Sequence, residues 1–117
     1  MNSLIERIKV WFAMRKADRE LTRAIVKALK LYEDHNKRYY VLPDTHHKLR
    51  VFSWSELKQM KKQGLFSAHC KEPDFIRESF YFTPLRIDGE FLSSTIQKRK
   101  RDMWHEYYKL YRMTKGR

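Results

Sequence analysis

The stretch RYYVLPDTHHKLRVFSWSELKQMKKQGLF, residues 38–66, carries the clearest structural signals of the sequence. It begins with two runs of β-favouring residues, 38–42 and 48–52. Between them, residues 43–47 (Pro-Asp-Thr-His-His) have the composition of a hairpin loop. We therefore expect two antiparallel strands, with at least one face of the pair packed on a helix.

A short helix should follow this hairpin. Ser53 precedes Glu56 by three residues, which is the spacing of a capping box, and Gly64 is a suitable helix terminator. These signals predict a helix over residues 54–63. Residues 67–78 contain a proline and indicate an irregular connection, after which residues 79–83 have the composition of a third strand that could extend the hairpin to a sheet.

Helical patterns flank this centre on both sides. Residues 1–35 contain no glycine or proline after the capping spacing of Ser3 and Glu6, so they predict one long helix. Its second half has an apolar stripe that should face the core, made of Met14, Ala17, Leu21, Ala24, Ile25, Ala28, Leu29 and Tyr32. Near the other end, Asp88-Gly89 predicts a tight turn, and Ser93 or Ser94 can cap a last helix.

The expected fold class is therefore α+β, in a single domain of residues 1–117. A long N-terminal amphipathic helix over residues 1–35 precedes a β-rich centre over residues 36–92. That centre holds a small antiparallel sheet and the short helix. Residues 93–117 form a C-terminal helix that is both basic and aromatic, with an apolar stripe of Ile96, Met103, Trp104, Tyr107, Leu110 and Tyr111.

The charge of the chain points to a polyanionic partner. It has 26 Lys and Arg against 14 Asp and Glu, a formal net charge of +12 on 117 residues. There is no Gly-rich phosphate loop, and a lone cysteine, Cys70, excludes an intramolecular disulfide. No apolar stretch is long enough to span a membrane, and charges interrupt the start of the chain. We expect an intracellular protein that is not secreted through a signal peptide, with membrane binding disfavoured.

Two basic clusters are candidates for nucleic-acid binding. The first, the basic ridge, has residues spaced by three or four on the N-terminal helix, while Asp18 and Glu20 are expected to point elsewhere. The second, the basic run, has four like charges in one helical turn, whose repulsion an anion would relieve. The alternatives are a solvated helix face and a surface turn with its aliphatic stems on the core. The ridge is Lys16, Arg19, Arg23, Lys27 and Lys30, and the run is Lys98, Arg99, Lys100 and Arg101.

Aromatic residues offer two further interpretations. Tyr107, Tyr108 and Tyr111 behind the basic run could stack on bases, although tyrosines at helical spacing are more often core residues. In the first half of the long helix, apolar residues occur all round, which indicates contact on two sides or a kink near residues 15–20. We identify a partner interface there, for virion proteins or self-association, at Ile5, Trp11 and Phe12.

Catalytic and metal motifs are not recognisable. The pairs His46-His47 and His69-Cys70 are adjacent residues, and adjacent residues do not easily chelate one ion. Cys70 lacks a base with suitable geometry for nucleophilic catalysis. We therefore expect no enzyme activity, no metal, no cofactor and no small-molecule substrate.

Residues 36–43, 48–52 and 78–84 resemble segments of small basic proteins encoded by tailed bacteriophages of gut bacteria. The resemblance implies phage origin and a role in DNA metabolism, host takeover or the virion, and it carries no residue roles. The leading hypothesis is a non-enzymatic protein that binds nucleic acid mainly through phosphates, with DNA and RNA both open. One alternative is a structural or adaptor subunit of a virion or another assembly. Another is an inhibitor of a host enzyme that acts on nucleic acid.

Overall fold

A three-stranded antiparallel sheet forms the centre of the fold. The structure, a computed structural model, describes residues 2–67, 69–85 and 89–113. Strand β1 (Tyr39–Pro43) lies between β2 (Leu49–Ser53) and β3 (Tyr81–Phe82), and Tyr40 is paired with Phe52 on one side and Phe82 on the other. The predicted hairpin and third strand are confirmed, although β3 has only two residues.

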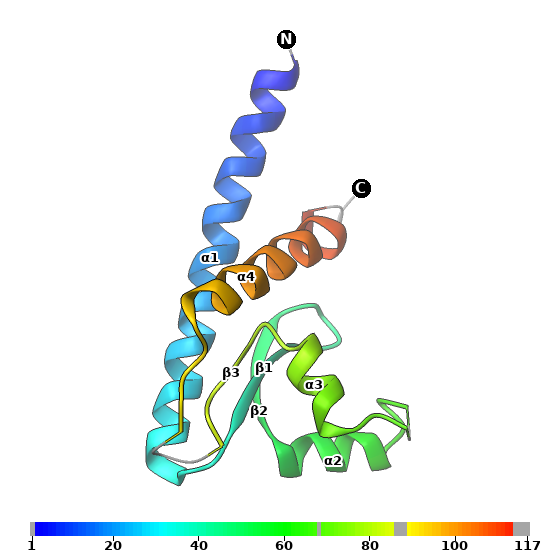
Figure 1. Ribbon diagram of the computed structural model, residues 1–117. Coiled ribbons are helices and arrows are strands. Elements are labelled where there is room, and N and C mark those ends of the chain that lie inside the picture. The colour runs from blue at the N-terminus through cyan, green and yellow to red at the C-terminus, as the bar shows by residue number, and fades with distance from the viewer. Residues whose placement is uncertain (1, 68, 86–88, 114–117) are drawn as a thin grey trace.

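Helices cover both faces of this sheet (Figure 1). Helices α1 (Asn2–His35) and α4 (Ser94–Tyr108) lie on one face, and α2 (Trp54–Lys62) and α3 (Glu72–Glu78) lie on the other. Alternate residues of a strand point to opposite faces, so Tyr39 and Val41 pack under α1 and α4. Tyr40 and Leu42 pack in the second cluster with Leu57 and Phe75. The fold is therefore α+β, with a long N-terminal and a C-terminal helix as expected.

Helix α1 spans the full length of the molecule. Its 34 residues, at a rise of about 1.5 Å each, account for the longest dimension of 51 Å. The predicted apolar stripe is confirmed: Ala17, Leu21, Ala24, Ala28 and Tyr32 are buried, and Met14, Ile25 and Leu29 pack against them. Among the residues that the structure describes, neither α1 nor another helix is long and apolar enough to cross a membrane.

One side chain fixes α4 across α1. Trp104 is completely buried, and its indole Nε1 donates a hydrogen bond of 2.8 Å to the carbonyl oxygen of Ala17. Small alanine side chains on α1 leave room for this large ring. Ser93 caps α4 by accepting from the amide of Ile96, and after Tyr108 the chain continues as one π-helical turn, Lys109–Met113. Residues 114–117 of the predicted C-terminal helix lie outside the described residues.

The signals around α2 are also confirmed. Ser53 and Glu56 form the predicted capping box, each accepting from the backbone of the other. At the other end, Gly64 has a φ of +80°, which favours glycine. Its amide donates to Lys61 and that of Leu65 donates to Met60, the two bonds of a Schellman motif.

Helix α3 corrects the prediction of an irregular connection over residues 67–78. Pro73 is in the first turn of this helix, where its missing amide hydrogen costs nothing. The carboxylate of Asp74 accepts from the amide of Lys71, and Phe75 is buried in the second core cluster. The other predicted local feature, the turn at Asp88-Gly89, includes Asp88, which lies outside the described residues.

Candidate nucleic-acid interface

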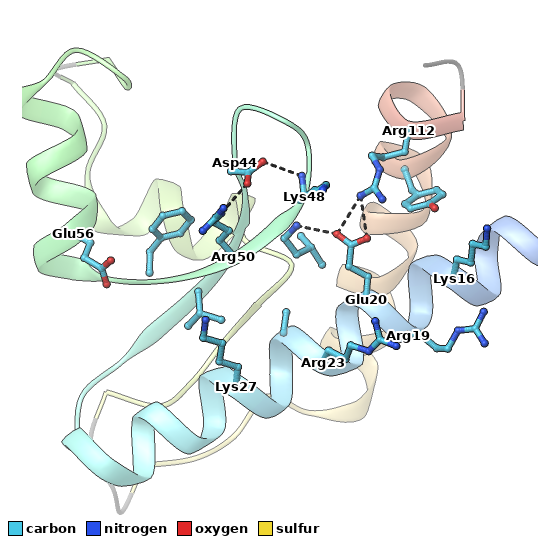
Figure 2. A pocket seen from close by; sticks show the side chains of 15 residues that line it. Lys16, Arg19, Glu20, Arg23, Lys27, Asp44, Lys48, Arg50, Glu56 and Arg112 are labelled. Carbon is cyan, nitrogen blue, oxygen red and sulfur yellow. Dashed lines mark hydrogen bonds and ion pairs between the residues drawn. The ribbon is translucent and has the colours of Figure 1, made fainter. Parts of the chain in front are cut away.

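An open groove of about 870 Å³ lies between α1 and the β1–β2 hairpin (Figure 2). The cations on its α1 side come from the basic ridge, and Lys48 and Arg50 line it from the hairpin. Arg112, just beyond α4, lines one end. Seven cationic and three acidic side chains from three distant segments therefore meet in this groove.

Four of the five ridge residues, Lys16, Arg19, Arg23 and Lys27, line the groove, and Lys30 does not. Their spacing of three or four residues places them along one side of α1, and each is exposed. Within the described residues, none of the four has a carboxylate at ion-pair distance. Their charges are therefore available to a ligand.

Glu20 is also in this groove, so the prediction that it points elsewhere is wrong. It lies four residues after Lys16, which puts it beside the ridge on the same side of the helix. Arg112 Nη1 lies 3.0 and 3.1 Å from its two carboxylate oxygens, and the amide of Leu49 donates to it at 2.9 Å. The Glu20 carboxylate thus connects α1 with strand β2 and with the turn that follows α4.

The other two carboxylates of the groove are engaged as well. Asp44 accepts from Arg50 Nε at 2.8 Å and from the amides of His46 and Lys48 in the hairpin loop. The hydrogen bond from Arg50 is the main reason why the pKa of Asp44 falls to about 2. Glu56 is held by its capping bond to Ser53. All three acids therefore have structural partners, while the four ridge cations of the groove have no ion-pair partner within the described part of the chain.

The aromatic side chains that line this groove are buried at its base. Phe52 and Tyr108 are buried, and the guanidinium of Arg112 lies 4.8 Å from the centre of the Tyr108 ring. Tyr107 is half-buried, with its hydroxyl 2.6 Å from His47 Nδ1, and burial raises its pKa. Tyr111 is exposed but stacks on His47, with ring centres 4.6 Å apart. The ring centres of Tyr107 and Tyr111 are 4.6 Å apart, whereas Tyr108 is buried, so the three rings do not share one exposed surface.

The basic run divides into two kinds of residue. Lys98, Arg99 and Arg101 are exposed, but Lys100 is 6% exposed. Its ammonium donates to the carbonyl oxygens of Ser79 at 2.7 Å and Ile76 at 2.8 Å, at the C-terminal end of α3. Burial lowers its pKa. The prediction that Lys100 contacts nucleic acid is wrong, because its donors satisfy carbonyls that the end of a helix leaves without partners.

The exposed part of the run is separated from the ridge. Lys98 and Arg101 line a smaller hollow of about 380 Å³ together with Asp18, Thr22 and Ile25 of α1. At about 100° per residue, these three α1 residues lie on the opposite side of the helix from the ridge. The two basic clusters therefore belong to different faces of the molecule.

The predicted partner residues lie at the N-terminal end of α1. Ile5, Trp11 and Phe12 are each about half exposed, on turns that project beyond the rest of the fold (Figure 1). Helix α1 continues unbroken through residues 15–20, the region of the suggested kink.

Comparisons with protein-family models, with curated proteins and with solved structures found no match for this chain. The resemblance to phage proteins therefore stays a prediction. In the described part of the chain, no three His, Cys, Asp or Glu side chains are grouped so that they could hold a metal ion.

Proposed function

We propose that this protein binds nucleic acid through its phosphate groups, in the groove between α1 and the β1–β2 hairpin, without catalysing a reaction. One observation carries the proposal. Four exposed ridge cations, which have no ion-pair partner among the residues that the structure describes, line a groove whose three carboxylates are already engaged.

The charge balance of the groove favours a polyanion over solvent. Like charges held in one groove repel one another, and an anion with several phosphates relieves that repulsion and releases counterions. On an ordinary solvated face, acidic residues are interspersed and face the solvent with the cations. Here Glu20 is drawn to Arg112 and away from its ridge neighbours, so the positive field of Lys16, Arg19 and Arg23 is left uncompensated.

The chemistry of the groove supports phosphate contact rather than base recognition. Its free groups are long ammonium and guanidinium side chains at the margin, and its rings are buried beneath. Such contacts position a backbone without reading its sequence, and both DNA and RNA present them. If the phage resemblance holds, the protein acts in the host cytoplasm or in the virion.

A direct test compares two variants of equal charge change. In about 100 mM salt, fluorescence anisotropy with duplex DNA and single-stranded RNA should show that the double variant Arg23→Glu, Lys27→Glu loses more than about 100-fold in affinity. The control Lys98→Glu, Arg101→Glu should lose only a few-fold, because its residues lie outside the groove. Equal losses would mean that only net charge matters.

Negligible binding by the wild-type protein would overturn the proposal. The groove would then be better matched to an acidic protein surface, as expected of an inhibitor of a host enzyme. The adaptor alternative rests on a different observation, the exposed apolar turns of α1.

A further inference from the structure

The first turns of α1 carry an unpartnered apolar surface. Residues 3–9 are all exposed, and contact with the core begins only at Ala13 and Met14. Soluble monomers rarely expose contiguous apolar patches larger than a few hundred Å². The N-terminal stripe consists of Leu4 (62% exposed), Ile5 (52%), Ile8 (47%), Trp11 (54%) and Phe12 (57%).

This N-terminal stripe lies on one side of the helix. Leu4, Ile8 and Trp11 follow one line at spacings of four and three, and Ile5 and Phe12 lie beside it, so the stripe spans about 120°. Ile5 and Arg23 are a whole number of turns apart at about 3.6 residues per turn. The edge of the stripe is therefore continuous with the basic ridge, and its occupant lies toward the groove side of α1.

We propose that the occupant is a second copy of this chain, paired antiparallel through the N-terminal stripe about a two-fold axis at Ile8. In this register Ile8 meets Ile8 of the second copy. Ile5 then lies beside Phe12 of the second copy on the flank nearer the ridge, and Leu4 lies beside Trp11 on the other flank. Each position thus meets an apolar partner, and each copy offers the same patch, as a two-fold interface requires.

Charge selects the antiparallel orientation. A parallel pair would bring Arg15, Lys16 and Arg19 of one copy alongside the same residues of the other, at a repulsive cost. An antiparallel pair directs the two basic ridges away from each other, toward opposite ends of the dimer. The guanidinium of Arg15 lies 4.9 Å from the centre of the Trp11 ring.

The area of the stripe predicts a reversible dimer. The exposed halves of these five side chains present roughly 400 Å² of apolar surface, because an aromatic side chain has about 150–250 Å² in all and the three aliphatic ones have less. A standard stable interface buries about 800 Å² per partner. Flanking aliphatic stems would supply part of the difference, so we expect association in the micromolar range.

The dimer has a consequence for the groove, which rests on the proposed function. Around the axis of α1, the basic ridge lies about 60° from the centre of the N-terminal stripe. A two-fold axis perpendicular to both helices therefore places the ridges of the two copies on the same side of the dimer. Each groove is centred about 20 Å along the helix from Ile8, so the two grooves would be about 40 Å apart. This spacing is close to one turn of B-DNA, about 34–36 Å.

The test is sedimentation equilibrium of the full chain without nucleic acid, from about 1 to 100 µM. We expect a monomer–dimer equilibrium that Ile8→Arg weakens at least 10-fold, because it places two charges on the axis. The matched control is Val26→Arg, an exposed apolar residue on the same side of α1 that lies outside the stripe. It should leave the dimer unchanged, and thermal unfolding should show that both variants remain folded.

Cross-linking tests the orientation. In a Cys70→Ser background, Ile5→Cys and Phe12→Cys proteins mixed with glutathione disulfide should join to each other faster than either joins to itself. Preferential joining of each to itself would overturn the antiparallel pairing.

Two further results would overturn the dimer. One is a monomer at 100 µM. The other is a monomer whose tryptophan fluorescence shifts on vesicles of phosphatidylglycerol and phosphatidylcholine, with Ile8→Arg abolishing the shift, which would assign the stripe to a membrane surface. The dimer is measured without nucleic acid and should strengthen with salt, whereas binding of nucleic acid in the groove should weaken with salt. Failure of the dimer proposal can therefore be distinguished from failure of the proposed function.

Discussion

The basic ridge and the basic run look alike in the sequence, but the fold uses them differently. The ridge keeps Lys16, Arg19, Arg23 and Lys27 free along a groove. The run places Lys100 under the surface, bonded to backbone carbonyls, and its exposed neighbours lie on the other side of α1.

The difference teaches that the partner a cation meets in the fold decides its role. The end of α3 offers carbonyl oxygens without helical partners, and Lys100 satisfies them. Within the described residues, no carboxylate lies at ion-pair distance from Arg23 or Lys27, so those charges stay available. Density of charge along the sequence therefore does not by itself identify a binding surface.

The largest expected effect is on the free energy of unfolding, when Lys100, the buried residue of the basic run, is replaced. Replacing Lys100→Met should lower the free energy of unfolding by about 3 kcal/mol, because buried carbonyls of Ile76 and Ser79 lose a charged donor. The exposed neighbour provides the control, since Arg99→Met should change it by less than about 0.5 kcal/mol. Urea unfolding followed by circular dichroism measures both. Equal effects would contradict the structural role of Lys100.

A smaller effect, on the affinity for nucleic acid, is expected from the Arg112–Glu20 ion pair at one end of the groove. Arg112→Gln should weaken nucleic-acid binding by about tenfold, because it removes one cation and frees the carboxylate of Glu20 beside the ridge. Glu20→Gln should strengthen binding by about threefold, since it removes a negative charge from the groove. Anisotropy titrations at one salt concentration compare the two. Changes of the same sign would show that this pair does not set the charge of the groove.

The smallest effect concerns Arg50, a groove cation that is engaged within the hairpin. Its partner Asp44 has a pKa lowered from 3.8 to about 2, so the stabilisation is complete above about pH 4 and is lost as pH falls toward 2. Because Arg50 is 67% exposed, we expect at most about 1 kcal/mol. The difference in urea midpoint between wild type and Asp44→Asn should shrink between pH 5 and pH 2. A difference independent of pH would exclude this ion pair as its source.

Local signals predicted much of the fold. The hairpin, the Ser53–Glu56 capping box and the Gly64 terminator act over a few residues, and each is present. The sequence pattern does not predict helix α3, because a proline within a polar stretch is typical of irregular structure, although Pro73 is compatible with the first turn of a helix.

The candidate site was only partly predictable. Helical periodicity identified the ridge, and the same periodicity could have placed Glu20 beside it. Lys48, Arg50 and Arg112 join the groove through tertiary contacts that no local pattern encodes. The burial of Lys100 likewise depends on α3, more than twenty residues away along the chain.

The most direct test of the account is the salt dependence of binding to duplex DNA. For the wild-type protein, the logarithm of the association constant should fall linearly with the logarithm of salt concentration. Neutralising two groove cations with Arg23→Gln and Lys27→Gln should reduce the slope by about 2, while Lys98→Gln with Arg101→Gln should leave it unchanged. Equal slopes for both double variants, or a wild-type affinity that does not depend on salt, would contradict the groove as the phosphate-binding surface.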